Sequence, residues 1–429
     1  MQYLAPALQP IHNLPRLMLF DLSFGGHHGN YIQHLIDWAY QQGFRGAIDI
    51  VVLPQFAQIH QDLVATIDRE KQPQIDLVTI SAAEATSLGS RDSGISRALR
   101  NLREWQVFCK YAKDLQTTQA LIMYLDTCEL PLAIGMQSPC PFSGIYFRPT
   151  FHYQMFENYC PENRDKLQHW RERFTLSRIL NNPQLQTVFC LDPFAVKAIA
   201  SQHHTTKVVQ LADPVQPYPS ISSVATLKTK LGIEAHRQVF LFFGGLDERK
   251  GVYQLLEAIQ LLSPELCEHL CLLLVGKPSP TDQVNIHQKV TALCQTKPIQ
   301  AIEHYEFILE ADVPSYFQLA DTILAPYQRH VGMSGILLLA AAAGKPVLSS
   351  DYGLMGELAR RYQLGLAVDS TKPPEIAQAL ATFLSASPQT LCNPSQMKLF
   401  AEQNSIYSYA STIFQHLLPD EQTAKIDRH

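Results

Sequence analysis

Two adjacent cations in the second half of the chain stand in a setting that suits a diphosphate. Arg249 and Lys250 follow the glycine pair Gly244-Gly245, and Gly251 then opens an amphipathic helical segment. Helix N–H groups, the helix dipole and two cations would all attract the same anion. A charged pair is more often simply solvated, but this one comes just after an apolar run that is typical of a strand. The stretch therefore predicts a site for a phosphorylated ligand.

The stretch HVGMSGILLLAAAAGKPVLSS, from position 330, offers a loop and a helix of the same kind. Its loop consists of Gly332, Met333, Ser334 and Gly335, with Ser334 suited to the helix N-cap and Gly344 to the helix end. The N–H groups of this loop could bind a phosphate. The helix is apolar on all sides, and we therefore expect it to be buried.

The stretch SFGGHHGN lies between an apolar run and a helical pattern near the N-terminus. It contains five residues that a ligand could contact: Gly25, Gly26, His27, His28 and Asn30. Glycines let a backbone approach a ligand closely, here where the following helix dipole is positive. A tight turn is the alternative, but a turn does not need the two histidines and the asparagine. We expect this loop to contribute to binding.

The segment SGIYFRPTFHYQ contains another strand-like run, followed by a cation and a histidine. Arg148 is a candidate for binding an anionic acceptor or a phosphate. His152 is either a functional residue at a strand end or a structural histidine beside aromatic residues. Both interpretations stay open at this point.

These residues must be positioned by strands and helices, and short apolar runs alternate with amphipathic segments along the chain. This alternation predicts parallel sheets covered by helices. In the first half we expect strands at 17–22, 47–53, 75–80, 120–125, 187–191 and 208–211. The proline-rich stretch at 212–220 predicts a linker, after which we expect strands at 239–243, 272–275, 322–325 and 346–349. Helix N-caps are expected at Ser81, with Glu84, and at Asp192 before Pro193.

Composition indicates a globular protein without a nucleic-acid partner. Hydrophobic residues make up 46% and charged residues 17% of the 429 residues, and the net charge is −5. Nine cysteines without a CxxC pair indicate reduced thiols, which favours a cytoplasmic location. The N-terminus lacks the basic start and apolar run of a signal peptide. No window reaches the ~18 to 20 apolar residues of a membrane-spanning helix.

Two segments are both basic and amphipathic. They are ISRALRNLREWQVFCKYAKDL, from Ile95, and NRDKLQHWRERFTLSRIL, from Asn163. A solvated helix face is the usual explanation of such a pattern. The alternative is peripheral contact with the inner face of a membrane that contains anionic lipids.

The order of motifs in the second half resembles a known enzyme family. A strand, Gly244-Gly245-Leu246, Arg249-Lys250-Gly251 and a Leu-Leu-Glu-Ala helix are similar to the start of the donor domain in GT-B glycosyltransferases of the glycogen-synthase-like, or family 4, type. Three further stretches match in the right order: LADPV at 211–215, VPSYFQLADTILAPY at 313–327 and AAGKPVLSSDYGLMGEL at 342–358. The resemblance covers 239–369 and is weak over the first 210 residues.

This resemblance implies an α/β fold of the GT-B type, in which two doubly wound Rossmann-like domains face a cleft. We expect an acceptor-binding domain at 1–215, a nucleotide-sugar-binding domain at 216–400 and a C-terminal helix in 401–429 that packs back on the first domain. The implied reaction transfers a sugar from a nucleoside-diphosphate sugar to a glycan, lipid-linked or small-molecule acceptor, with retention of configuration. No metal and no cofactor besides the sugar nucleotide are expected.

The resemblance also implies roles for individual residues. Arg249 and Lys250 would neutralise the departing diphosphate together with loop N–H groups. His152 resembles the family histidine that lies near the transferred sugar. The expected donor-binding residues are Gly244, Gly245, Tyr327, His330, Gly332, Met333, Ser334, Gly335 and Glu357. The Gly25–His28 loop, Asn30 and Arg148 would bind the acceptor.

The sequence departs from the family at three positions. Val331 and Leu339 stand where the family carries two glutamates, and Gly245 stands where it carries an arginine. A glutamate at position 339 would need a polar partner in a buried helix, so we expect leucine there to cost the fold nothing. Tyr327, His330 or Glu357 would then recognise the sugar. One alternative is a non-catalytic GT-B shell used for binding or assembly. Another is a GT-B epimerase, but such an enzyme would need acidic residues that the donor loop lacks.

Overall fold

The computed structural model describes residues 14–23, 28–69, 74–90, 93–159, 161–215 and 224–418. They belong to two compact units. The first unit comprises Met1–Pro149, Leu167–Leu211 and Tyr409–His429, and the second comprises Thr150–Lys166 and Ala212–Ser408. The second unit thus includes Thr150–Lys166, a stretch that the expected domain at 1–215 contained.

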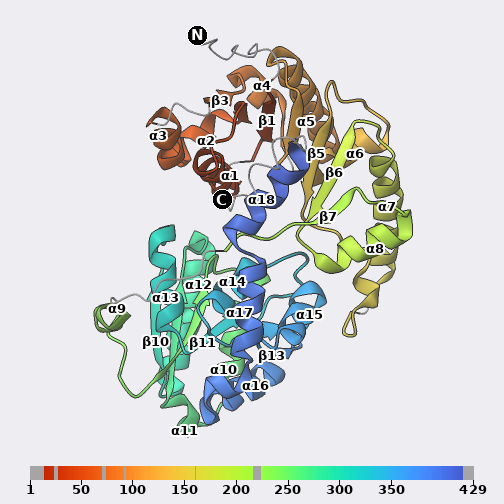
Figure 1. Ribbon diagram of the computed structural model, residues 1–429. Helices are drawn as coiled ribbons and strands as arrows, with labels where there is room; N and C mark the ends of the chain where they lie inside the picture. The colour runs from red at the N-terminus through yellow and green to blue at the C-terminus, as the bar shows by residue number, and fades with distance from the viewer. Residues whose placement is uncertain are drawn as a thin grey trace, which may run out of the picture. The chain divides into compact units, whose positions relative to one another are not determined.

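The first unit is built on a parallel sheet of seven strands in the order β3-β2-β1-β4-β5-β6-β7 (Figure 1). Its strands are β1 (Arg16–Asp21), β2 (Ala47–Val52), β3 (Gln74–Thr79), β4 (Gln119–Ile122), β5 (Phe142–Tyr146), β6 (Leu185–Cys190) and β7 (Val208–Gln210). The intervening helices are α1 (His28–Gln41), α2 (Pro54–Ile59), α3 (Gln61–Arg69), α4 (Ala82–Ser87), α5 (Gly94–Asp114), η2 (Leu125–Cys128), α6 (Glu129–Ala133), α7 (Asn163–Leu180) and α8 (Pro193–His203). The chain adds β2 and β3 on one side of β1 and then places β4 on the other. This reversal creates a switch point at the carboxyl ends of β1 and β4, where ligands of such sheets bind.

The second unit repeats this plan with six parallel strands in the order β10-β9-β8-β11-β12-β13. Its strands are β8 (Gln238–Phe243), β9 (Leu270–Val275), β10 (Gln300–His304), β11 (Thr322–Ala325), β12 (Val347–Ser350) and β13 (Gly365–Val368). Its helices are η3 (Tyr153–Met155), α9 (Val224–Lys230), η4 (Glu248–Lys250), α10 (Val252–Gln260), α11 (Pro264–Cys267), α12 (Pro280–Thr296), η5 (Glu310–Asp312), α13 (Val313–Leu319), α14 (Gly335–Ala342), α15 (Gly353–Arg361), α16 (Pro373–Ser385), η6 (Pro388–Leu391) and α17 (Pro394–Gln403). The corresponding switch point lies between β8 and β11.

Two doubly wound parallel sheets confirm the predicted fold class. The central strands β1, β2 and β9 are almost entirely buried, as their apolar runs predicted. Two predicted helix starts are also confirmed. Ser81 and Glu84 form a capping box at α4, and the Asp192 side chain accepts hydrogen bonds from two N–H groups at the start of α8. The edge strands β10 and β13 were not predicted, because they are only partly buried and lack a long apolar run.

The last described helix, α18 (Ile406–Leu417), carries residues of both units. From Tyr409 onward it packs within the first unit. The Phe414 ring stacks on Trp38, with ring centroids 4.4 Å apart, and the Tyr409 ring meets Tyr31 edge to face at 5.2 Å. These aromatic contacts attach the C-terminal helix to α1, whose first turn follows the first switch point.

Candidate functional site

Lys250 lies at the switch point of the second sheet. The Asp247 side chain caps η4 by accepting a hydrogen bond of 2.9 Å from the Lys250 backbone N–H. The Lys250 Nζ lies 3.5 Å from the carbonyl oxygen of Phe243, the last residue of β8, and 5.2 Å from the centre of the Tyr327 ring. A Cβ added at Gly244 would come within 2.5 Å of this Nζ, and the φ of +104° at Gly244 favours glycine there. Among the ion pairs of the described residues, none neutralises Lys250.

Arg249, Tyr327 and His330 adjoin this lysine. The N–H of Gln328 donates to the Arg249 carbonyl at 2.8 Å, which ties η4 to the segment after β11. The Arg249 guanidinium lies 3.4 Å from the His330 ring and 3.7 Å from the Asp247 carboxylate, and its side chain is exposed. The rings of Tyr327 and His330 are perpendicular, with centroids 5.4 Å apart. The structure thus gathers two cations and two aromatic rings where a ligand of this sheet would bind.

The loop before α14 is held more firmly than expected. The Gly332 N–H donates a buried hydrogen bond of 2.9 Å to the Tyr153 hydroxyl, so this group is not available to a phosphate. The Met333 carbonyl lies 3.4 Å from His330 Nε2. Ser334 occupies the N-cap position, but its side chain makes no cap hydrogen bond. The N–H groups of the first turn of α14, from Gly335, remain the expected phosphate donors.

The helix α14 is buried over most of its length, as its apolar sequence predicted. The expectation for position 339 was wrong in one respect. Leu339 is only partly buried. A glutamate at this position would therefore not have been confined to the core, and the absence of the acid is not explained by the cost of burying it.

Residues 150–166 bring groups from the first half of the sequence to the loop of the second unit. Tyr153 is fully buried and accepts the Gly332 hydrogen bond. A Cβ added at Gly353 would lie 2.7 Å from the Tyr153 ring, so glycine is needed where the start of α15 meets this tyrosine. Asn158 Nδ2 donates to Asp351 at 3.0 Å, and Arg329 pairs with Glu162 at 3.0 Å. Tyr153 is therefore positioned to fix the conformation of the loop before α14.

His152 was expected beside the transferred sugar, and the structure places it differently. Its side chain is only 1% exposed. The ring packs against those of Phe151, Tyr153 and Phe156, with centroids 5.0 to 5.5 Å away. This aromatic enclosure favours the structural interpretation of His152, because a ring so buried presents no surface to a ligand. The neighbouring Tyr153, which the sequence analysis did not select, makes the contact with the candidate site.

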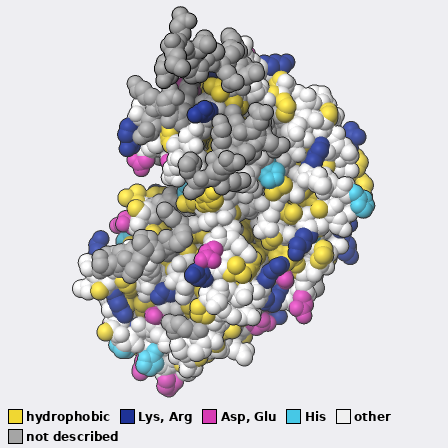
Figure 2. Space-filling view, in the orientation of Figure 1, with side chains coloured by type: hydrophobic (Ala, Val, Ile, Leu, Met, Phe, Trp, Pro, Cys, Tyr) yellow, Lys and Arg dark blue, Asp and Glu magenta, His cyan; other side chains and the backbone are white. Residues whose placement is uncertain are grey.

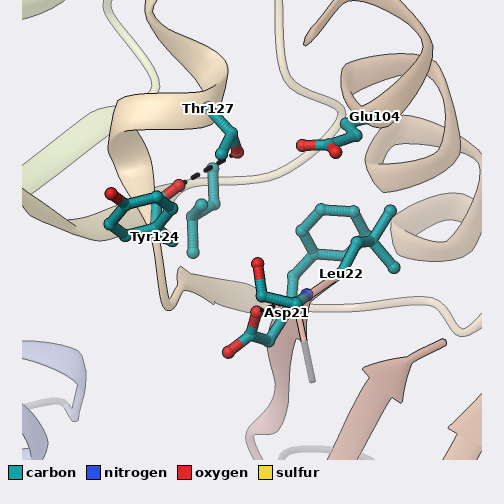
Figure 3. Close-up of a pocket in the computed structure, with 8 residues that line it drawn as sticks. Asp21, Leu22, Glu104, Tyr124 and Thr127 are labelled. Atoms are coloured by element: carbon teal, nitrogen blue, oxygen red, sulfur yellow. Dashed lines mark hydrogen bonds between the residues drawn. The ribbon is translucent and has the colours of Figure 1, made fainter. Parts of the chain in front are cut away.

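The switch point of the first sheet forms a small pocket between β1 and β4. Asp21, Glu104, Tyr124 and Thr127 are among the residues that line it, and Figure 3 shows that Asp21 and Glu104 come from different elements. The His28 Nδ1 lies 2.6 Å from the Asp21 carboxylate, and its ring meets that of Tyr124 edge to face. The aspartate orients the histidine at the first turn of α1. Asp21 could have been noticed in the sequence, because it interrupts an otherwise apolar run.

Acidic groups lie beside the first switch point. Asp126 in η2 accepts hydrogen bonds from the backbone N–H groups of Phe147 and Arg148. Burial raises the pKa of Asp126 to about 6. Burial, with the charges of Asp126 and Glu172, raises the pKa of Glu129 to about 8. Arg148 therefore lies next to the Asp126 carboxyl group, which holds the turn after β5 through its hydrogen bonds with two backbone N–H groups.

The remaining predicted site residues are more dispersed. Gly25, Gly26 and His27 lie outside the described residues. Asn30 is partly buried in the first turn of α1. Glu357 lies on α15, where it pairs with Arg360 at 3.4 Å. Within the described ranges, no group of three or more His, Cys, Asp or Glu side chains is placed to hold a metal ion, and no helix is long and apolar enough to cross a membrane.

Comparison with known proteins relates this geometry to a family. The Bacillus subtilis (strain 168) protein YtcC is 29% identical over 185 residues, which are 41% of this chain and 44% of that protein. The chain spans less than half the length of the curated relatives that it matches. Among solved structures, Anabaena Alr3699/HepE in complex with UDP and glucose has 15% identity and a TM-score of 0.64, covering 94% of this chain and 99% of that chain. Sucrose-phosphate synthase from Thermosynechococcus elongatus has 14% identity and a TM-score of 0.67, covering 94% and 98%.

At these identities the solved structures show the fold, which is of the GT-B type. The family match is confined to the second unit. Residues 237–386 match the family Glycosyl transferases group 1. This range contains β8, η4, β11 and the loop before α14, and therefore every residue of the cluster around Lys250 except Tyr153. The match therefore relates residues 237–386 to the glycosyl transferases group 1 family.

Proposed function

We propose that the protein transfers a sugar from a nucleoside-diphosphate sugar to an acceptor, with retention of anomeric configuration. The observation that carries this proposal is Lys250 at the β8–β11 switch point, with Arg249 and the rings of Tyr327 and His330 beside it. Arg249 is paired with Asp247, whereas Lys250 makes no ion pair among the described residues and would attract an anion. The family match of residues 237–386 makes the diphosphate of a sugar nucleotide the anion of choice.

The chain's own residues supply what the departing diphosphate needs. When the bond between the anomeric carbon and the phosphate oxygen breaks, the leaving diphosphate keeps the electron pair and gains negative charge. Lys250 and Arg249 neutralise this charge, and the first N–H groups of α14 add hydrogen bonds and the positive end of the helix dipole. Because these groups are already in place before the bond breaks, they stabilise the charge as it develops.

Donor recognition in this chain cannot use the two glutamates of the family pattern. Val331 and Leu339 carry no polar group, whereas Tyr327 and His330 meet beside Lys250. We propose that these two rings recognise the sugar or the nucleoside in place of the acids, with Glu357 as a further candidate. Alr3699/HepE was solved with UDP and glucose, so uridine diphosphate is the first nucleotide to test.

The first turn of α1, beside the small pocket of the first unit, is the proposed acceptor site. Asp21 accepts the hydrogen bond from His28 Nδ1, which leaves Nε2 of the same ring to accept a hydroxyl proton. The carboxylates of Asp21 and Glu104 are held by His28 and Arg100, and the cavity of about 10 Å³ between them has room for no more than a water molecule. His28 is therefore the group that we propose to meet an acceptor hydroxyl. A glycan, lipid-linked or small-molecule acceptor would all meet this requirement, and Arg148 would favour an anionic one.

Two further properties belong to the proposal. Transfer would not need a metal ion, because Lys250 and Arg249 supply the counter-charge that a divalent cation gives other transferases. The location would be the cytoplasm, since the eight described cysteines are all free thiols, including the exposed Cys294. Unchanged turnover in excess EDTA would support metal independence, and loss of turnover that Mg²⁺ or Mn²⁺ restores would refute it.

Incubation of the purified protein with a panel of sugar nucleotides and acceptors tests transfer itself. Mass spectrometry should detect a glycosylated acceptor, and NMR of the product should show the anomeric configuration of the donor. His28→Ala should lower transfer to the acceptor more than hydrolysis of the donor. A product of inverted configuration would refute retention.

The second candidate function is non-catalytic binding or assembly by a GT-B shell. The absence of both acids, at Val331 and Leu339, favours it. Nucleotide binding without transfer or hydrolysis across the whole panel would support this function. Turnover that Lys250→Ala abolishes would exclude it.

A further inference from the structure

The helix α7 (Asn163–Leu180) presents an apolar stripe to solvent. Leu167, Trp170 and Phe174 are 68%, 66% and 57% exposed, and their spacing places them on one face of the helix. The Trp170 and Phe174 rings stack, with centroids 6.1 Å apart and an angle of 12° between their planes. The opposite face is buried in the first unit through Leu176 and Ile179, among others. The helix thus has one apolar face for the core and a second that nothing in the described chain covers.

Cations flank this stripe on both sides. At about 100° per residue, Arg171 and Arg178 lie along one side of it and Arg173 lies along the other, all of them exposed. Arg178 Nε donates to the Ala133 carbonyl at 3.2 Å, which ties this flank to the end of α6. The residue after Ala133 is Ile134, which is 60% exposed and extends the apolar surface. Figure 2 shows Lys and Arg side chains beside hydrophobic ones along the margin where α7 runs in Figure 1.

The acid of this part of the helix is turned away from solvent. Between Leu167 and Leu180 the only carboxylate is Glu172. It is buried and accepts a hydrogen bond of 2.9 Å from the Tyr146 hydroxyl. The outward face of α7 therefore carries an apolar stripe with arginines along its edges, and the carboxylate of Glu172 does not lie on it.

We propose that this outward face of α7 docks on a membrane that contains anionic lipids. A helix lying in the plane of a bilayer places apolar side chains among the acyl chains and extends its cations to the headgroups, which is the arrangement of Leu167, Trp170 and Phe174 between Arg171 and Arg173. Tryptophan is suited to the headgroup level, because its ring is apolar and its N–H is polar. The charge of the whole chain is −5, so attraction to an anionic surface must come from this local patch.

A second copy of this chain explains these features less well. An apolar stripe alone would suit a second copy of the chain, but the cations on both edges would then face the same cations of the partner wherever the two stripes pack against each other. Docking of α7 does not depend on the proposed glycosyl transfer. It would also bring the first unit to the surface from which a lipid-linked acceptor could be taken.

Trp170 gives the docking surface its own optical probe. The chain has three tryptophans, and the other two, Trp38 and Trp105, are 4% and 0% exposed. Addition of vesicles of phosphatidylcholine with 30% phosphatidylglycerol should therefore shift the emission of Trp170 to shorter wavelength and bring the full-length protein up with the vesicles in flotation. Vesicles of phosphatidylcholine alone should do neither, and 0.5 M salt should weaken binding.

Two pairs of substitutions separate the parts of the proposal. Trp170→Ser with Phe174→Ser, and Arg171→Glu with Arg173→Glu, should each lower the partition coefficient at least tenfold. Phe307→Ser changes an aromatic residue that is 79% exposed in the second unit, and it should leave binding unchanged. All these side chains are exposed, so the fold should persist.

Three results would overturn docking on anionic lipid. One is the absence of flotation with anionic vesicles. Another is flotation that both pairs of substitutions leave unchanged. The third is a concentration-dependent dimer that Trp170→Ser with Phe174→Ser abolishes while vesicle binding is absent, because the stripe would then be an interface between copies. The glycosyl transfer assay is independent of all three.

Discussion

Removal of the Tyr153 hydroxyl tests whether this residue fixes the conformation of the loop before α14 or only lies next to it. Tyr153→Phe keeps the buried ring and its contact with Gly353, and deletes the acceptor of the Gly332 N–H. The Tyr153 hydroxyl accepts this hydrogen bond from the loop before α14. We expect an effect of the substitution on nucleotide binding to act through the loop.

The magnitude follows from the burial of this hydrogen bond. A buried N–H left without a partner costs about 1 to 3 kcal/mol, so the free loop of the variant should rearrange until water reaches Gly332. Binding must then restore the closed loop against that cost. Since about 1.4 kcal/mol is a tenfold change in Kd, the full range corresponds to roughly 5- to 150-fold. Partial relaxation of the bound loop reduces the effect, and we expect a loss on the order of tenfold.

Calorimetric titration with the nucleoside diphosphate that binds the wild type measures this loss. Tyr362→Phe is a matched control, because it removes a tyrosine hydroxyl of the same unit that donates to Gln403 at 2.8 Å rather than to the loop. Circular dichroism melts of both variants should show folded proteins. Wild-type affinity in Tyr153→Phe, or the same loss in Tyr362→Phe, would refute the positioning role.

Two further predictions concern the donor site and the first unit. Gly245 stands where the family pattern has an arginine, and a Cβ there would meet only Asp247 Oδ2 at 3.7 Å, so Gly245→Arg should fold and bind the diphosphate about tenfold more tightly by adding one charge-assisted contact; unchanged or weaker binding in calorimetry would show that this position does not face the anion. In the folded state the pKa of Glu129 is raised to about 8, so this carboxyl retains a proton that the unfolded chain has already released. The free energy of unfolding should therefore fall as the pH rises from about 4.5 to 8, and Glu129→Gln should flatten this fall in urea titrations; an equally steep fall in the variant would contradict the cause assigned.

The central strands could be predicted because burial on both faces imposes a visible apolar run. The strand expected at 322–325 is confirmed as β11, which begins at Thr322 and ends at Ala325. β10 carries Gln300, Glu303 and His304, and an edge strand that is only half-buried tolerates such residues. Its place beside β9 is fixed by backbone hydrogen bonds, which leave no signature in side-chain type.

The candidate site could be predicted only where one segment holds all the contacts. Arg249 and Lys250 belong to one short motif with the glycines that let Lys250 reach the end of β8. This motif could therefore be recognised in the sequence. The contact of Tyr153 with Gly332 joins residues far apart in the sequence, and no local sequence pattern predicts it. His152 and Tyr153 are neighbours among aromatic residues, and only packing shows that the tyrosine, and not the histidine, meets the loop.

The central claim is that the cluster around Lys250 binds the diphosphate of a sugar nucleotide. Calorimetry with a panel of nucleoside diphosphates tests it most directly, with Lys250→Ala compared to Lys398→Ala, a change of a solvent-exposed lysine on α17. We predict that at least one nucleotide binds the wild type and the Lys398 variant equally. Loss of Lys250 should weaken binding by about 10- to 150-fold, the range for a charged hydrogen bond of about 1.5 to 3 kcal/mol. No binding by any nucleotide, or binding that is indifferent to Lys250, would contradict the account.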